Sequence, residues 1–367
     1  MNPIAIYSGG TVIYWSAVVI CLGIAACFAL SFALYTANGG RGVALWVFFP
    51  LAVALSVVFC RFLHWYCHIE QYAGLASAMK DYSSGGYCLP GLLASIPLAA
   101  FAVSRLRLAD SAASLLDGIA PGAALCIAFI RLSSLFGSSC RSKISVNTPA
   151  LQHLPLASGI VNSAGETEYR FATFFIHFLL MLVIAVMLLR LYNRRAGMPM
   201  KRGCPQDGHM IRLFLLFYSA TEIVMDSTRY DSSYLHFNGR FIGNILNKAA
   251  GFISFGMLAA AVSVLCLLIF YSKRSVRANG MSAKHIAIWT GYVLALAAAG
   301  VSEYLVQRHG NWYLACYGVM TLCCIIMAAL VYCLYLTVCD TPDSSEKNDA
   351  YPVRRSRDER AQYSYYG

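Results

Sequence analysis

The chain has 367 residues, of which 59% are hydrophobic and 12% are charged, and its mean hydropathy is +0.60. Soluble domains carry about 25% charged residues, so this composition excludes a large soluble enzyme. The formal net charge of +11 fits anionic lipid headgroups, since the sequence contains no nucleic-acid-binding module. Most of the 14 cysteines lie in apolar runs, where a thiol behaves as a small hydrophobe, and we expect no disulfide framework.

Charge-poor apolar stretches recur along the whole chain, and a membrane-spanning helix needs roughly 20 such residues. We therefore expect an all-α polytopic membrane protein, because open sheets leave backbone groups unpaired in lipid. The expected helices cover residues 11–35, 43–66, 87–104, 115–136, 169–189, 210–227, 249–272, 286–304 and 311–339. The fourth and sixth are the least apolar, because Arg131, Glu222 and Asp226 interrupt them.

The distribution of Lys and Arg predicts the orientation of these helices. The connections that follow the first, third, fifth and seventh helices hold more basic residues than those on the other side. Basic connections favour the cytoplasmic side, so we expect the N-terminus outside and the C-terminus inside. Residues 340–367 are polar and charged, and we expect them to form a disordered cytoplasmic tail.

Ionisable side chains in several of these helices are predicted to converge near the outer surface. His64 approaches it on the second helix, Arg131 on the fourth and Glu222 on the sixth. The loop before the third helix contains Gly85 and Gly86, where backbone can approach a ligand closely. Charges within a membrane are costly and indicate a functional site. The alternative is a structural network of ion pairs that ties the helices together.

The sixth helix carries the densest group of polar residues. Tyr218, Glu222, Asp226 and Arg229 are spaced by four, four and three residues, so they share one helix face. Its two carboxylates repel each other and require a cation or a proton between them. Arg131 follows a long uncharged stretch and precedes serines. This pattern suits a phosphate ligand, or an arginine whose head reaches the membrane interface.

Three further features have simpler interpretations. Cys60, His64 and His68 repeat at every fourth position, a spacing that can bind zinc. No second group of ligands accompanies them, so we interpret them as residues of the interface and expect no metal site. His177 lies in an apolar run and is interpreted as a packed or helix-bridging residue. Glu303 is interpreted as one half of an interfacial ion pair.

From about Ile13 to Ser272, the order of the motifs resembles that of bacterial phosphatidylglycerol–prolipoprotein diacylglyceryl transferases, which are seven-helix inner-membrane enzymes. The matching segments are Arg61-Phe62, Ser84–Gly91, Leu116–Pro121, Ile130–Phe136 and Tyr218–Asp231. Other positions depart from the family pattern. Its motif histidine is replaced by Pro90, its signature asparagine by Ser134 and its signature glutamate by Ser139. The arginine of its sixth helix is replaced by Glu222, which reverses the charge.

The resemblance implies transfer of a diacylglyceryl group from phosphatidylglycerol to the lipobox cysteine of a prolipoprotein signal peptide. The reaction would take place at the outer leaflet of the bacterial cytoplasmic membrane, without a cofactor, a metal or nucleic acid. From the residues and the resemblance together, the candidate catalytic residues are Arg131, Asp226, Arg229, Tyr218 and Glu222. The candidate substrate-binding residues are Arg61, Gly85, Gly86, Asp117, Ser134 and His64.

The resemblance also divides the chain into three segments. Residues 1–272 would form the seven-helix core, residues 273–339 an additional pair of transmembrane helices, and residues 340–367 the tail. Because the motif histidine is absent, the general base would be Asp226, Glu222 or His64. Two alternatives stay open: a degenerate family member that binds lipid or assists another membrane enzyme, and a small-solute transporter.

Overall fold

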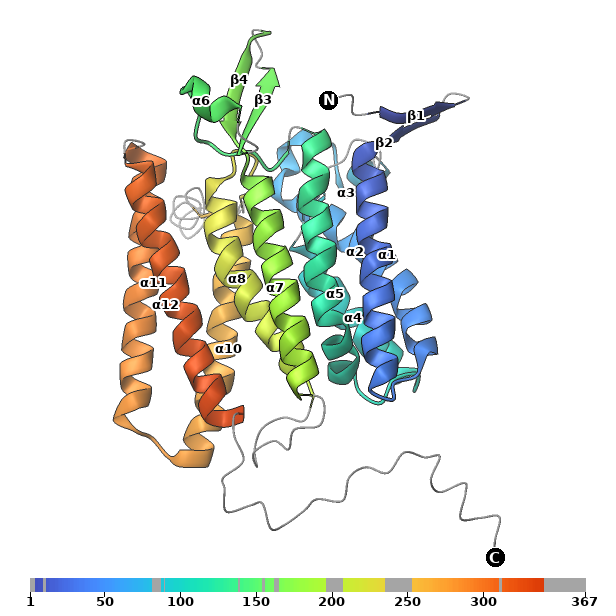
Figure 1. Ribbon diagram of the computed structural model, residues 1–367, viewed down its shortest axis with the longest axis vertical. Helices are drawn as coiled ribbons and strands as arrows, with labels where there is room; N and C mark the ends of the chain where they lie inside the picture. Colours follow the sequence, from blue (N-terminus) through green and yellow to red (C-terminus); the bar gives the residue numbers. More distant parts are fainter. Residues whose placement is uncertain are drawn as a thin grey trace, which may run out of the picture.

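The computed structural model describes residues 4–8, 11–80, 87–88, 90–137, 139–153, 156–161, 165–195, 207–234, 253–309 and 312–339. The expected ligand-binding glycines Gly85 and Gly86, and the tail 340–367, lie outside the described residues. The described part is a bundle of long helices with two short hairpins, which confirms the expected all-α class. In Figure 1 the helices run roughly side by side, and both hairpins lie at the same end of the bundle.

Each expected apolar stretch contains a helix. The long helices are α1 (Trp15–Ala37), α2 (Gly42–Cys67), α4 (Gly91–Arg105), α5 (Ala112–Ser133), α7 (Thr173–Arg195), α8 (His209–Thr228), α10 (Phe255–Asn279), α11 (Ala283–His309) and α12 (Tyr313–Cys339). Two short helices, α3 (Leu75–Lys80) and α6 (Pro149–Gln152), lie in the connections.

Seven of the described helices are long and apolar enough to cross a membrane: α1, α2, α5, α7, α10, α11 and α12. The chain is therefore a multi-pass membrane protein. Helix α4 has 15 residues, or about 22 Å, which is shorter than the roughly 30 Å hydrocarbon core. Helix α8 is long enough, but its charged residues keep it out of the apolar group. The bundle buries both carboxylates of this helix, Glu222 and Asp226.

The sequence pattern did not predict the hairpins, because short strands adjoin longer apolar runs. Strand β1 (Ile4–Ser8) pairs antiparallel with β2 (Thr11–Tyr14), and β3 (Ala157–Val161) pairs with β4 (Thr167–Phe171). The expected helices over 11–35 and 169–189 were therefore too long at their N-terminal ends. Residues such as Thr, Val, Ile and Tyr favour strands, and they form the stretch 11–14.

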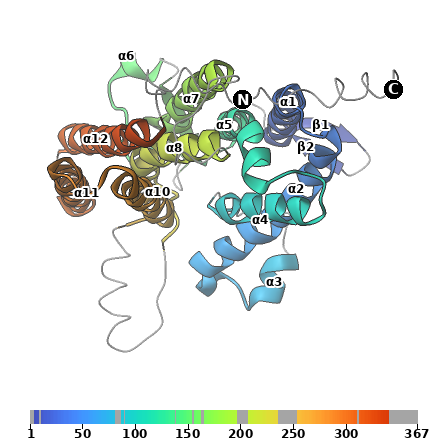
Figure 2. The same cartoon turned by 90° about the horizontal axis from the view of Figure 1, so that it is seen from below.

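Helix α5 lies at the centre of the bundle and contacts α1, α7 and α8 (Figures 1 and 2). Its contact with α1 is close because glycines face that helix. A Cβ added at Gly122 would lie 2.7 Å from Ser31 Oγ, and one added at Gly118 would lie 3.1 Å from Tyr35 Cβ. Small residues spaced by four let transmembrane backbones approach, so this spacing positions α5, and Arg131 with it.

Helices α11 and α12 pack together on one flank of the bundle, and α12 contacts α8 and α10 (Figure 2). Aromatic contacts join the C-terminal part of α12 to the first half of α8. The ring of Tyr335 meets that of His209 at 6.2 Å between centroids, and the ring of Tyr332 meets that of Phe217 at 6.2 Å. The C-terminal helix pair therefore supports the helix that carries most of the predicted catalytic residues.

Candidate active site

A cavity of about 780 Å³, which we call the polar chamber, opens at the end of the bundle that carries the hairpins. The C-terminal ends of α2, α5 and α8 and the N-terminal ends of α4 and α10 form its walls. Six of the predicted site residues line it: His64, Arg131, Ser134, Glu222, Asp226 and Arg229. The structure thus brings together side chains that are as many as 165 positions apart in the sequence.

Arg131 of α5 forms a buried ion pair with Glu222 of α8. Its Nη2 donates to both carboxylate oxygens, at 2.8 and 3.1 Å, and both side chains are almost fully buried. The second oxygen of Glu222 also lies 3.4 Å from His177 Nε2 on α7. Glu222, the position at which the resemblance implies a reversed charge, is therefore neutralised by Arg131. His177 bridges α7 and α8, as the sequence interpretation proposed.

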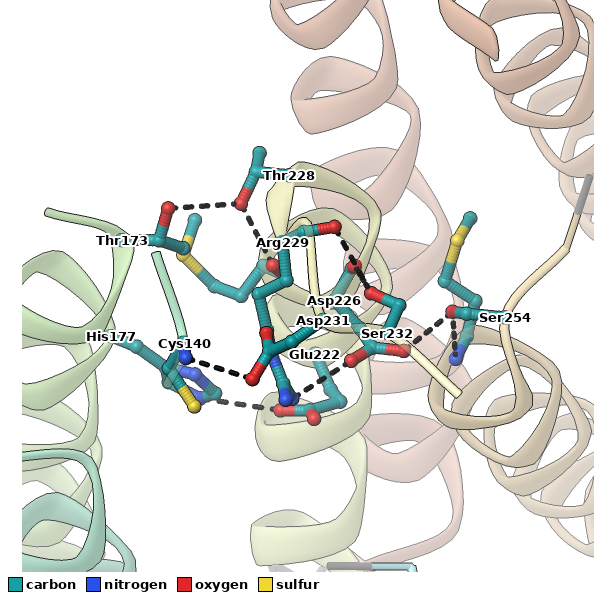
Figure 3. Close-up of polar contacts among 12 residues, drawn as sticks. Cys140, Thr173, His177, Glu222, Asp226, Thr228, Arg229, Asp231, Ser232 and Ser254 are labelled. Carbon is teal, nitrogen blue, oxygen red and sulfur yellow. Dashed lines mark hydrogen bonds and ion pairs between the residues drawn. The ribbon is translucent and has the colours of Figure 1, made fainter. Parts of the chain in front are cut away.

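Arg229 lies between two carboxylates at the C-terminal end of α8 (Figure 3). Its Nη1 is 3.0 Å from Asp226 Oδ1, and its Nε donates to Asp231 Oδ1 at 3.1 Å. The second oxygen of Asp226 accepts a hydrogen bond from Ser254, the N-cap residue of α10. These contacts join the end of α8, the loop that follows it and the start of α10 into one rigid group.

Space around the Asp226 carboxylate is tightly limited. A Cβ added at Gly256, in the first turn of α10, would lie 2.4 Å from Asp226 Oδ2. Only glycine therefore lets α10 approach α8 this closely. In the loop beyond α8, burial raises the pKa of Asp231, but the Arg229 guanidinium and the backbone N–H of Cys140 outweigh it and hold that pKa below its usual value.

Cys140 contacts Arg131 and Asp231, the carboxylate that pairs with Arg229. Arg131 Nη1 is 3.3 Å from Cys140 Sγ, and the backbone N–H of Cys140 donates to Asp231 Oδ2 at 3.0 Å. Its φ of 56° is in the left-handed region, which residues other than glycine seldom adopt. The sequence pattern did not single out Cys140. The one indication of its role was its position nine residues after Arg131.

Three of the predicted residues lie outside the chamber lining. Arg61 is buried behind it: its Nε donates to the Ala78 carbonyl at 2.8 Å, and its guanidinium lies over the ring of Tyr87, which does line the chamber. Tyr218 faces a separate apolar pocket one turn deeper in the bundle and stacks with His177 at 6.5 Å. Its burial places it beneath the charged group, one turn before Glu222 on the same helix face.

Asp117 lies near the opposite end of α5, about 20 Å along the helix from Arg131. It accepts hydrogen bonds from the backbone N–H groups of Gly208, His209 and Ile211, at 2.6, 3.0 and 3.0 Å. A carboxylate at a helix N-terminus satisfies its free N–H groups and complements its dipole. The structure therefore assigns Asp117 to the start of α8 and not to the ligand chamber.

Replacing Asp117 with Ala is expected to lower the free energy of unfolding by about 1.5–3 kcal/mol, because charge-assisted hydrogen bonds to the first turn of α8 are lost. Asn, which retains a side-chain oxygen, is expected to recover part of this loss. Thermal unfolding of the purified protein in detergent measures both changes. Activity per folded molecule should match that of the wild type, and a loss of activity without a loss of stability would instead place Asp117 in substrate binding.

An apolar pocket of about 250 Å³ adjoins the chamber between α1, α2, α4 and α5. The two cavities share four lining residues: Ser56, Val57, Leu92 and Ile130. A molecule with a charged head and an apolar tail could therefore extend from one into the other. Within the chamber, the rings of His64 and His68 stack at 4.2 Å between centroids.

Helix α11 reaches the charged group from behind. Glu303 is 1% exposed and accepts hydrogen bonds from Ser227, the residue after Asp226, and from Gln307. Tyr317 of α12 lies 3.3 Å from the Ser227 carbonyl. The expected interfacial ion pair of Glu303 was therefore wrong: the side chain is buried and contacts Ser227 of α8, 76 positions earlier in the sequence.

These features define a multi-pass membrane protein with a charged chamber joined to an apolar pocket. The family model for prolipoprotein diacylglyceryl transferase matches residues 3–273, and the chain belongs to this family of transferases. A curated relative, the phosphatidylglycerol–prolipoprotein diacylglyceryl transferase of Clostridium novyi (strain NT), is 24% identical over 240 residues, which cover 64% of this chain and 87% of the relative. The family expected from the motifs is thus confirmed, and α11 and α12 lie beyond the matched residues.

Proposed function

We propose that this transferase moves the diacylglyceryl group of phosphatidylglycerol to the lipobox cysteine of a prolipoprotein. The observation that carries the proposal is the junction of the polar chamber and the apolar pocket. The chamber holds Arg131 and Arg229, which suit a phosphate. The adjoining pocket is lined almost entirely by apolar side chains, which suit acyl chains. A phospholipid has this same division between head and tails.

In the proposed reaction the acceptor sulfur attacks the glyceryl carbon that carries the phosphate. A carbon–sulfur bond forms, the carbon–oxygen bond to the phosphate breaks, and glycerol phosphate leaves with the electron pair. Arg131 and Arg229 would stabilise the negative charge on the departing phosphate. Asp226 and Asp231 orient Arg229 by binding its Nη1 and Nε, and no hydrogen bond from its Nη2 is present among the described residues, so Nη2 could donate to the ligand.

The acceptor thiol must lose its proton in this step, and His64 is the base that we propose. Glu222 is occupied by Arg131, and Asp226 is occupied by Arg229 and Ser254. His64 lines the chamber, and its ring nitrogens make no hydrogen bond to the described residues. A neutral imidazole there could accept the thiol proton and pass it to the leaving phosphate.

We further propose that the chamber faces the outer leaflet of the bacterial cytoplasmic membrane. The prevalence of Lys and Arg in the connections at the other end supports this orientation. It would give the chamber access to a signal peptide whose cysteine lies at the outer surface, and it would place the C-terminal tail in the cytoplasm.

The test uses purified protein in liposomes and a peptide that contains a lipobox cysteine. The phosphatidylglycerol is labelled in its diacylglyceryl unit, which is the part that is transferred. We expect label on the peptide in a form that resists hydroxylamine, because the product is a thioether and not a thioester. A peptide with serine in place of cysteine is the matched control. Arg229→Gln should reduce transfer about 10²–10³-fold, as the loss of one donor to a developing oxyanion does.

Phosphatidylethanolamine carrying the same label tests the donor, and transfer from it at an equal rate would contradict the choice of phosphatidylglycerol. If folded, lipid-bound protein transfers no label from either lipid, the result would favour a family member that binds lipid without turnover. Flux of a small solute into the same liposomes would favour a transporter.

A further inference from the structure

A second cavity of about 520 Å³ lies at the end of the bundle opposite the polar chamber. It is formed where α10 ends and α11 begins, the turn at the lower left of Figure 1, and we call it the elbow cavity. Its polar lining residues are Ser272, Lys273, Arg277, His285, Trp289 and Thr290. It lies at and beyond residue 272, next to the helix pair that extends past the matched family region.

The cationic groups of the elbow cavity come from one face of α10. Lys273 and Arg277 are four positions apart, so both project from the same side of the helix. No acidic side chain occurs among the described residues that line the cavity. An anion that enters therefore meets two positive charges without competition from a carboxylate in the lining.

His285 supplies an unused polar atom in the first turn of α11. The side chain is 7% exposed, and its Nε2 lies 2.9 Å from Ser275 Oγ. Its Nδ1 is buried and has no hydrogen-bond partner among the described residues. Buried polar atoms in folded proteins almost always have a partner, so this unpartnered nitrogen, on a residue that lines the cationic cavity, is a candidate contact for a ligand.

The surroundings of the elbow cavity favour a lipid over a soluble anion. Met281 and Ile286 line the same cavity and are 77% and 61% exposed. Trp289 also lines it and donates from Nε1 to Ser272 Oγ at 3.0 Å. Tryptophan concentrates at the boundary between lipid tails and headgroups. Cations, an interfacial tryptophan and bare apolar side chains thus meet in one place.

We propose that the elbow cavity binds the phosphate headgroup of an anionic phospholipid from the leaflet opposite the polar chamber. Lys273 and Arg277 neutralise the phosphate, His285 Nδ1 hydrogen-bonds to an oxygen of the headgroup, and the acyl chains lie along Met281 and Ile286. Basic pockets between transmembrane helices bind headgroups in this manner. The bound lipid would fill the gap between α10 and α11 and fix the C-terminal helix pair to the core.

The test uses full-length protein in liposomes and the fluorescence of Trp289, taken as the difference between the wild type and Trp289→Phe. Acyl-brominated phosphatidylglycerol in a phosphatidylcholine bilayer should quench this fluorescence more strongly than brominated phosphatidylcholine at the same fraction. In Lys273→Gln and Arg277→Gln, the preference for the anionic lipid should fall about fivefold for each charge removed. The double variant should show almost no preference.

Lys284→Gln is the matched control, because Lys284 is exposed at the same end of the bundle and does not line the cavity. A fall in preference equal to that of Lys273→Gln would overturn the proposal in favour of general surface charge. Inorganic phosphate and glycerol phosphate are added as soluble competitors. Loss of quenching at millimolar concentrations of either would overturn a lipid site in favour of a soluble phosphate site, and unchanged quenching would support the lipid.

Discussion

Arg131→Gln is expected to lower the free energy of unfolding by about 3–5 kcal/mol, because it leaves the Glu222 carboxylate buried without the guanidinium that pairs with it. Glu222→Gln is expected to be destabilising for the complementary reason, since it leaves a buried guanidinium. The double variant should recover much of the loss, because neither charge remains. Thermal unfolding in detergent, repeated for the wild type and the three variants, gives the coupling between the two sites.

Transfer activity, measured for the wild type and the same three variants, distinguishes a structural role of Arg131 from a catalytic one. The double variant restores the fold but removes the guanidinium that we assign to the phosphate, so we expect it to stay about 10²–10³-fold less active than the wild type. A double variant that recovers both stability and activity would show that Arg131 only ties α5 to α8. Additive losses of stability would contradict the ion pair itself.

This pair also bears on the substitution that the motif resemblance implies at Glu222. A carboxylate in place of the arginine that the resemblance implies would remove one positive charge from the chamber and add a negative one. In the structure, Arg131 and His177 both contact the Glu222 carboxylate. The three carboxylates Glu222, Asp226 and Asp231 therefore orient the chamber arginines, which we propose as the phosphate ligands.

The helices could be predicted from the sequence because each apolar run is long and uniform. The convergence of Arg131, Glu222, Asp226 and Arg229 was also predictable, since charges in apolar helices rarely face lipid. The partners of these charges were not, because a helix pattern shows which face is polar but not which neighbour meets it. The resemblance associated Asp117 with substrate, yet the distance along α5 and the start of α8 make it a helix cap.

Other site residues carry no local sequence signal. Ser254 and Gly256 become important only because α10 begins beside Asp226. Glu303 lies 77 positions after Asp226 in a helix whose polar residues show no pronounced face. Its role depends on the packing of α11 against the end of α8, which is a long-range contact.

Glu303→Ala is expected to reduce the turnover number by up to about 10²-fold, with a smaller change in KM for the lipid. Glu303 accepts the hydroxyl of Ser227 and so fixes the last turn of α8, which carries Asp226 and precedes Arg229. Loss of that contact would let the two residues shift, and displacements of about 1 Å at a reacting centre have effects of this size. We therefore expect Glu303 to act as a positioning residue, through Ser227 and without contact with the substrate.

Glu303→Gln separates hydrogen bonding from charge, because its amide oxygen can still accept the Ser227 hydroxyl, and we expect it to retain most of the activity. Ser302→Ala is the matched control: Ser302 is buried on the same helix, but among the described residues its hydroxyl bonds only to the Ala298 carbonyl of that helix. Steady-state kinetics with labelled phosphatidylglycerol measure all three variants. Equal losses in Glu303→Ala and Ser302→Ala would mean that α11 serves only to stabilise the bundle. A selective loss in Glu303→Ala, restored by Gln, would make the C-terminal helix pair a working part of the transferase site.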